Sequence, residues 1–395
     1  MTAPSMSAHF AGRKPSVIRA AQIEYLKRSD GVKDLNVAIG NVSLPMHPAM
    51  QARMNSLGED DSPFSGGVVQ YSLTKGEPWA NDAFLNIIAS SGFDTDGLFS
   101  QITDGGSQAM ELCIVGLCGP AGTAERPLLL IDAAYTNYNA FASRLGRKTV
   151  SICRTLGQDG RFSLPAMDEI RALVDATKPA ALVVIPYDNP TGQLYDREAM
   201  IDLARLCVEK DMWMLSDEAY RELHYVGDSA ISVWGITEDE VPGISGRRIS
   251  IETASKVWNA CGLRIGALVT DNADFHARAV AENTAGLCSN IIGQWIFGGL
   301  ANESHADLKG WYDQQREYYR AMLTEEGIVA PPIEDLWQQH RCQVLYPWVG
   351  AVTTLAMGDE WQPLSYVMAT LERLHTLLAA LDTGDAVREG IGLSR

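Results

Sequence analysis

The chain has 395 residues, of which 46% are hydrophobic and 21% are charged, an ordinary composition for a globular protein long enough for two domains, one of them discontinuous. Its formal net charge is −17, from 32 basic and 49 acidic residues, which argues against nucleic acid and anionic membranes as partners. Seven scattered cysteines without a CxxC pair, no long apolar run and no leader segment lead us to expect a cytoplasmic protein with reduced thiols and no metal site.

The first 76 residues offer three weak signals. A helix is expected from Ser16 to Lys27, and an apolar run then leads into a turn at Gly40. A glycine there lets backbone approach a ligand closely, although it also suits an ordinary turn. Further on, Tyr71 stands in the segment YSLTKG, where a lone tyrosine more often packs in a core. None of these residues identifies a function by itself.

A strand, turn and helix are predicted from Gln101, in the segment QITDGGSQAMELCIVGLC. Its apolar residues recur at helical spacing, which places Gly105, Gly106 and Ser107 at the amino end of the helix. Free backbone amides, the helix dipole and a serine hydroxyl suit that end for binding phosphate. The segment lacks a Walker A lysine and GxGxxG spacing, so an ordinary capped helix start is the alternative.

Four apolar runs follow at the spacing of alternating strands and helices, at residues 127–131, 181–185, 212–215 and 248–251. Runs that are apolar throughout indicate strands buried on both faces, hence an α/β fold with a mostly parallel sheet sandwiched by helices. Ligands bind beyond the carboxyl ends of such strands. We therefore expect one site lined by the residues that follow the four runs, namely Tyr135, Asn189, Asp217 and Lys256.

These side chains, together with Tyr220, suit an electron-accepting ring. Asp217 could stay anionic beside a protonated ring nitrogen, although it could also cap the following helix. Asn189 and Tyr220 could hydrogen-bond a ring oxygen, and Asn189 also stands in an Asn-Pro pair typical of turns. Tyr135 could lie flat on the ring or pack in the core.

Lys256 lies in the segment ISIETASKVWNACGLRIG. A lysine straight after an apolar strand is partly desolvated, which favours its neutral, nucleophilic amine and hence a Schiff base with an aldehyde. A solvated strand end is the alternative. Thr253 and Ser255 offer hydroxyls and Arg264 offers a planar cation, and all three suit a phosphate ester. The pattern predicts an aldehyde cofactor that carries a phosphate.

Taken together, these segments resemble the class I/II aminotransferases, the aspartate aminotransferase-like enzymes of pyridoxal-phosphate fold type I. The matching segments keep the order and spacing of the family over about residues 15 to 300; they are SVIR, YSLTKG, ITDGGSQA, YTNYNAF, YDNPTG, SDEAYRE and TASKVWNACGLRIG. The resemblance implies a large cofactor-binding domain at residues 45–299 and a smaller discontinuous α+β domain from residues 1–44 and 300–395. It also implies a homodimer.

The resemblance further implies a role for each residue around the ring of pyridoxal 5'-phosphate. Lys256 would form the Schiff base and move a substrate proton, with Asp217 and Tyr220 as its catalytic partners. Asp217 would pair with the pyridine nitrogen, Asn189 and Tyr220 would bind the phenolic oxygen, and Tyr135 would stack on the ring.

The phosphate and the substrate would be held by other residues. The resemblance assigns the phosphate to Gly106, Ser107, Thr253 and Arg264, with Tyr71 reaching the phosphate of the neighbouring subunit. Gly40 and Asn189 would help to receive the substrate.

The chain departs from the family pattern after about Gly327. The tail contains Trp337, Trp348 and Trp361 but no strand-borne arginine of the kind that grips a substrate carboxylate, which leaves Arg388 as the best candidate. A diverged small domain, an altered reading frame and a truncation would each give such an ending. We therefore expect the cofactor to bind well and amino acids to bind weakly.

The sequence thus predicts a pyridoxal-phosphate-dependent aminotransferase that moves an amino group between an L-amino acid and a 2-oxo acid. A C–S β-lyase or a decarboxylase would keep every cofactor residue and differ only in where the electrons leave. The alternative of another class is a non-catalytic ligand-sensing domain, as found fused to transcription regulators. The retained Lys256 and the absence of a basic N-terminal extension of helix-turn-helix size argue against it.

Overall fold

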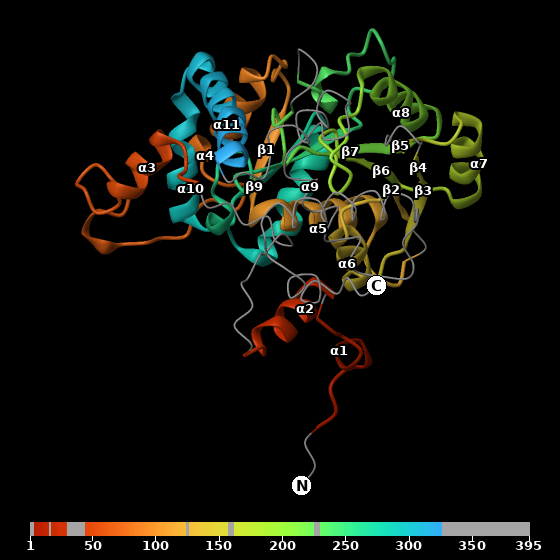
Figure 1. Ribbon diagram of the computed structural model, residues 1–395, viewed down its shortest axis with the longest axis horizontal. Coiled ribbons are helices and arrows are strands. Elements are labelled where there is room, and N and C mark those ends of the chain that lie inside the picture. Colours follow the sequence, from red (N-terminus) through yellow and green to blue (C-terminus); the bar gives the residue numbers. More distant parts are fainter. Residues whose placement is uncertain are drawn as a thin grey trace. The chain divides into compact units, whose positions relative to one another are not determined.

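The computed structural model describes residues 4–15, 17–29, 44–123, 126–156, 162–224 and 230–325 (Figure 1). The chain divides into two compact units, one formed by residues 1–40 and 349–395 and the other by residues 41–348. In the first unit, the described part holds helices α1 (Ala8–Ala11) and α2 (Val17–Leu26), and α2 falls within the helix expected from Ser16 to Lys27. The domain boundaries expected at residues 44 and 299 stay predictions.

The larger unit is built around a seven-stranded sheet with the order β1-β9-β8-β7-β6-β2-β3. Its strands are β1 (Phe99–Thr103), β2 (Leu128–Asp132), β3 (Thr149–Cys153), β6 (Ala181–Val184), β7 (Trp213–Asp217), β8 (Arg248–Thr253) and β9 (Gly266–Thr270). Strands β3, β2, β6, β7 and β8 pair in parallel, whereas β9 is antiparallel to both β8 and β1. The mostly parallel sheet is confirmed, and β2, β6, β7 and β8 coincide with the four apolar runs. A separate hairpin pairs β4 (Thr155–Leu156) with β5 (Phe162–Ser163).

Each face of the sheet carries its own layer of helices, because successive strand residues point to opposite faces. Leu130 and Leu215 pack on one face with α5 (Gly105–Cys118), α6 (Asn137–Arg144) and α9 (Ala273–Asn283). Leu129 and Met214 pack on the other with α4 (Pro78–Ser90), α7 (Met167–Thr177) and α8 (Arg197–Glu209). The helix–sheet–helix sandwich expected from runs that are apolar throughout is therefore confirmed.

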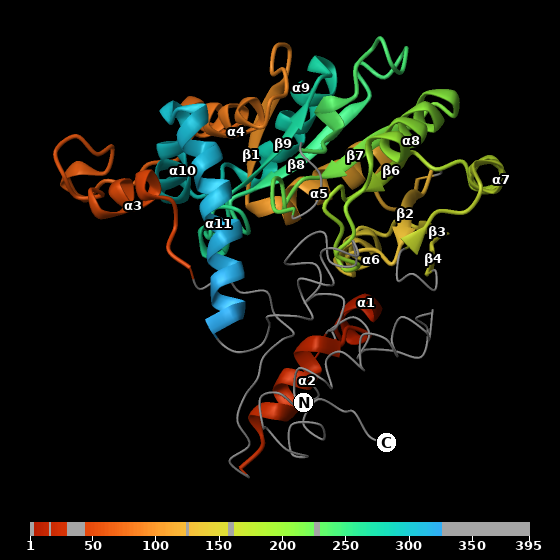
Figure 2. The same cartoon turned by 45° about the horizontal axis from the view of Figure 1, so that its top comes forward.

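A further group of helices packs beside β1. They are α3 (Pro48–Asn55), α10 (Ile291–Phe297) and α11 (His305–Glu325), and α11 packs against α4 (Figure 2). Helix α11 also supports the segment after β8, since the Trp311 indole donates to the carbonyl of Val257 at 2.8 Å. Gln315 accepts from the Asn259 amide at 2.8 Å. The described part of the unit also contains five short 3₁₀ turns: η1 (Ser65–Gly67), η2 (Val233–Gly235), η3 (Cys261–Leu263), η4 (Thr284–Gly286) and η5 (Gly298–Asn302).

The described residues contain neither a membrane-spanning helix nor a cluster of metal ligands. None of their helices is long and apolar enough to cross a membrane. Among the same residues, no group of three or more histidine, cysteine, aspartate and glutamate side chains is arranged to hold a metal ion. The six cysteines that the structure describes are free thiols.

Candidate active site

Four adjacent strands deliver the residues singled out in the sequence to one edge of the sheet. Tyr135 follows β2, Asn189 follows β6, Asp217 ends β7 and Lys256 follows β8. These strands are neighbours and run in parallel, so their carboxyl ends lie side by side (Figure 1). The fold thus brings the four segments together at one edge of the sheet.

Asp217 presents a carboxylate that is held from two sides. Tyr138 of α6 donates its hydroxyl to Oδ2 at 2.6 Å, and the backbone amide of Ala219 donates to Oδ1 at 3.1 Å. Burial raises the pKa of the Asp217 carboxyl, and the two hydrogen bonds oppose that rise because they favour the anion. The strand end therefore supplies a carboxylate fixed in orientation, as an interaction with a cationic ring nitrogen requires.

Asn189 and Tyr220 meet across the site. The Asn189 amide donates to the Tyr220 hydroxyl at 3.2 Å, which joins the loop after β6 to the turn after β7. Burial raises the pKa of the Tyr220 phenol, and the nearby Tyr135 and Asp217 raise it further, so Tyr220 keeps its proton. The Asn189 side chain carries two N–H donors and the neutral Tyr220 phenol carries an O–H donor. Both groups can therefore donate to one ligand oxygen.

Tyr135 is half-buried at the end of the β2 loop. The Asn137 amide donates to its hydroxyl at 2.6 Å. Its ring meets that of Tyr138 edge to face, with centroids 5.4 Å apart and planes at 85°. Tyr135 is thereby fixed beside the residue that holds Asp217, a placement compatible with a stacking role.

Lys256 lies in a short irregular segment between β8 and η3 and is half-buried. Burial lowers the pKa of its amine, Cys261 acts in the opposite direction, and the positive charge of Arg264 lowers the pKa further. A lysine with a lowered pKa is neutral in a larger fraction of molecules near neutral pH, and the neutral amine is the nucleophile. The chemistry expected of Lys256 agrees with its surroundings.

Tight backbone packing shapes the amino end of α5. Gly266, the first residue of β9, lies so close that a methyl group on it would be 2.6 Å from the carbonyl carbon of Gly105 and 2.7 Å from the amide nitrogen of Gly106. Gly105 has a φ of +72°, and a methyl group there would be 2.6 Å from Nη2 of Arg264. The Arg264 guanidinium is thus seated against the first turn of α5.

Hydroxyl groups border the same helix start. A methyl group on Gly106 would lie 4.0 Å from Cβ of Thr253, and the Thr253 hydroxyl donates to Ser255 at 2.8 Å. Ser107 stands in the first turn of α5, where backbone amides have no partner within the helix. Amides, hydroxyls and the Arg264 guanidinium together fit a phosphate ester.

Three residues with expected roles, Tyr71, Gly40 and Arg388, are not placed at this site by the described part of the structure. The side chain of Tyr71 is 82% exposed, in the segment between η1 and α4. Gly40 and Arg388 lie outside the described residues, as do the tryptophans of the tail. The roles given to these residues stay predictions.

A buried ion pair connects two of the loops that form the site. Arg154, directly after β3, donates to Oδ2 of Asp188 at 3.0 Å, and the two side chains are 2% and 3% exposed. The same guanidinium donates to the backbone carbonyls of Asp132, the last residue of β2, and of Ala133, which follows it. Asp188 immediately precedes Asn189, and Ala133 lies two residues before Tyr135. Arg154 therefore fixes both loops at once.

Two of these residues, Tyr138 and Arg154, were not singled out in the sequence. Tyr138 follows Tyr135 by three residues in YTNYNAF, and this helical spacing could have indicated a shared face. Arg154 gives no comparable signal, because its partner Asp188 is 34 residues away and only the pairing of the strands brings them together.

The family model and the relatives found among known protein sequences are all aminotransferases. A sequence model of the family described as "Aminotransferase class I and II" matches residues 100–326. The aspartate/prephenate aminotransferase of Thermus thermophilus is 26% identical over 333 residues, which cover 82% of this chain and 80% of that protein. The aspartate aminotransferase of Streptomyces avermitilis is 25% identical over 251 residues, which cover 62% of this chain but only 58% of that relative. The chain thus spans less than two thirds of the length of this second relative.

Solved structures show the same architecture. A double mutant of the aspartate aminotransferase of Thermus thermophilus matches with a TM-score of 0.71 and 20% sequence identity, over 95% of this chain and 100% of that chain. At this identity the likeness shows the fold alone. The predicted fold, a helix-sandwiched and mostly parallel sheet of the aspartate aminotransferase type, is confirmed.

Proposed function

Because the chain belongs to the class I and II aminotransferase family, whose sequence model matches more than half of its length, we propose that it is a pyridoxal-phosphate-dependent aminotransferase. Its substrates would be an L-amino acid and a 2-oxo acid. The observation that carries this proposal is the position of Lys256 and Asp217 at the ends of neighbouring parallel strands, with the amine partly desolvated and the carboxylate fixed by Tyr138.

The residues of the site fit pyridoxal 5'-phosphate. When bound, this group supplies an aldehyde for the amino group and a ring that accepts the electrons of a broken bond at the substrate carbon. Gly105, Gly266 and Arg264 suit its phosphate. A methyl group on Gly105 would collide with the Arg264 guanidinium, and one on Gly266 would collide with the backbone at the start of α5. Asp217 suits its ring nitrogen, because a buried carboxylate stabilises a cation beside it.

Lys256 supplies the proton transfer in this proposal. Its amine accepts a proton from the α-carbon of the substrate and returns it at a neighbouring carbon, as general base and then general acid. The lowered pKa of Lys256 serves both steps, since a base works best when its pKa lies near the operating pH. Tyr220 and Asn189 would bind the ring oxygen of the cofactor, and Tyr135 would stack on its ring.

The test is a reaction screen of purified protein incubated with pyridoxal phosphate. Amino donors are offered with 2-oxoglutarate, pyruvate or oxaloacetate, and keto acid, ammonia and CO₂ are measured together. The proposal expects a keto acid and a new amino acid in equal amounts, lost in Lys256→Ala and kept in Lys14→Ala, a change at an exposed lysine. Ammonia without amino transfer would indicate a β-lyase and CO₂ a decarboxylase, and either would contradict the proposal.

A further inference from the structure

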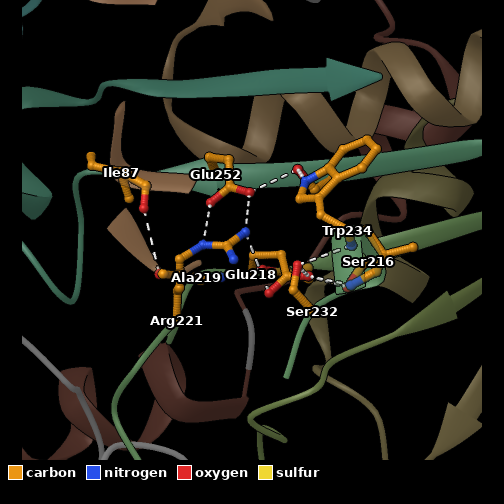
Figure 3. A network of polar contacts seen from close by, with 12 residues as sticks. Ile87, Ser216, Glu218, Ala219, Arg221, Ser232, Trp234 and Glu252 are labelled. Atoms are coloured by element: carbon orange, nitrogen blue, oxygen red, sulfur yellow. Dashed lines mark hydrogen bonds and ion pairs between the residues drawn. The ribbon is translucent and has the colours of Figure 1, made fainter. Parts of the chain in front are cut away.

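Below the site, three charged side chains are buried among polar neighbours (Figure 3). Arg221, in the turn after β7, donates to Glu252 of β8 from Nε at 3.3 Å and from Nη2 at 2.6 Å, and Nη2 also lies 3.6 Å from Oε2 of Glu218. The exposed fractions of these side chains are 2% for Arg221, 3% for Glu252 and 0% for Glu218. In this Arg221 cluster, one guanidinium is therefore shared by two carboxyl groups away from solvent.

The register of β7 and β8 places the Arg221 cluster back to back with Asp217. Ser216 pairs with Ser250, and Asp217 pairs with Ile251. Side chains alternate between the two faces of a sheet, so Glu252 shares the face of Ser250, whereas Asp217 shares the opposite face with Ile251. A single layer of backbone therefore separates the cluster from the carboxylate of the candidate active site.

Hydroxyl and amide groups hold the two glutamates in place. Oε1 of Glu218 accepts from the hydroxyls of Ser216 at 2.9 Å and Ser232 at 2.8 Å, and from the amide of Val233 at 3.1 Å. Oε1 of Glu252 accepts from the hydroxyl of Ser250 at 2.7 Å. These contacts place donor groups against both glutamates, and the Arg221 guanidinium is the cation that lies against both carboxyl groups.

The negative charge of Glu252 influences the pKa of the Asp217 carboxyl. Burial is the largest influence and raises the pKa of the Asp217 carboxyl, the bonds from Tyr138 and Ala219 lower it, and the negative charge of Glu252 raises it again. Tyr135 and Tyr220 also face this carboxylate, and both phenols have raised pKa values that keep them neutral. A cation placed against Glu252 therefore favours ionisation of Asp217 through the sheet.

We propose that Arg221 is a positioning residue for the candidate active site: its positive charge offsets the negative charge of Glu252 on the opposite face of the sheet, so that the Asp217 carboxylate stays ionised. The inference rests on the proposed function in one respect, since the ring nitrogen that Asp217 would face belongs to the proposed cofactor. Arg221 acts through Asp217 and takes no part in bond making.

The test measures Asp217 in the protein without added cofactor. The protein carries aspartate labelled with ¹³C in the side-chain carboxyl, the signal of Asp217 is assigned by its loss in Asp217→Asn, and its pH midpoint is followed by NMR. In Arg221→Met the midpoint should rise by about one pH unit, a tenfold change in the ionisation equilibrium. Arg221→Lys should restore part of the shift, and Arg221→Met/Glu252→Gln should return the midpoint close to that of the parent.

An unchanged midpoint in a folded Arg221→Met protein would overturn the proposal, as would an equal shift in the single and double variants. Losing one partner of a buried pair is more damaging than replacing both, so Arg221→Met could fail to fold. In that case the Glu252→Gln variant decides. Removing the negative charge of Glu252 should lower the pH midpoint of Asp217, and an unchanged midpoint would refute the inference. Absence of pyridoxal phosphate binding would remove the proposed function and leave this titration of Asp217 intact.

Discussion

Lys256 shows how burial sets the chemistry of a single residue. Its amine has a pKa below the ordinary lysine value of 10.5, chiefly because burial disfavours the charged form. In the unfolded chain the ordinary value returns. Between the two pKa values the folded protein binds fewer protons than the unfolded chain, so this residue makes stability increase as the pH rises through that interval.

This difference predicts the pH dependence of Lys256 modification. Cyanate reacts with neutral amines, so in the folded protein without cofactor the carbamylation of Lys256 should set in at lower pH than in the same protein unfolded in urea. Peptide mapping by mass spectrometry measures the rate at each pH. Identical pH profiles in the folded and unfolded proteins would show that the amine is not desolvated.

At the scale of elements, the start of α5 is held against β9 by a contact that only glycine permits. The substitution Gly266→Ala would place a methyl group 2.6 Å from the backbone of Gly105 and 2.7 Å from that of Gly106, forcing the helix start away from Arg264. Affinity for pyridoxal phosphate should fall at least tenfold, about 1.4 kcal/mol. Affinity for pyridoxal, which lacks the phosphate, should change little.

Gly262→Ala is the matched control for that substitution, because a methyl group on Gly262 meets nothing within 4 Å. Both affinities are measured by equilibrium titration of absorbance. Equal losses for pyridoxal and pyridoxal phosphate in Gly266→Ala would place the phosphate elsewhere.

The loops after β2 and β6 depend on Arg154. Replacing it by methionine leaves the buried carboxylate of Asp188 without its cation and frees the backbone after β2. Arg154→Met should lower the free energy of unfolding by about 3–5 kcal/mol, the usual cost of breaking a buried ion pair, and weaken binding of pyridoxal phosphate. Urea denaturation and absorbance titration provide the two measurements.

Arg171→Met provides the comparison at the surface, since Arg171 pairs with the exposed side chains of Asp168 and Glu209 and such pairs contribute little. If Arg154→Met is no more destabilising than Arg171→Met, the buried pair does not organise these loops.

For the whole molecule, the apolar runs and local segments were enough to predict the parallel sheet, the helices on both faces and the strand ends that carry Asp217 and Lys256. Those signals are local, because burial on both faces shows in each strand by itself. The pairs Arg154–Asp188 and Arg221–Glu252 were not predictable in this way. Their partners are 34 and 31 residues apart, and which charges meet depends on the register of neighbouring strands.

The proposed homodimer can be tested through Tyr71, whose side chain is 82% exposed and would serve the phosphate of the partner subunit. Mixing Tyr71→Phe with Lys256→Ala should give hybrid dimers in which one site carries both changes and the other carries neither. Activity should then exceed that of either variant alone. Purely monomeric protein with full activity in size-exclusion chromatography would exclude shared sites.

The central claim is that Lys256 is the residue that bonds covalently to pyridoxal phosphate, and chemical trapping tests it most directly. The protein is incubated with pyridoxal phosphate, reduced with borohydride, digested and mapped by mass spectrometry. The account predicts one phosphopyridoxyl group on the peptide that contains Lys256, at one group per chain, and its loss in Lys256→Ala. A group of the same stoichiometry on another lysine, or its persistence in Lys256→Ala, would contradict the account.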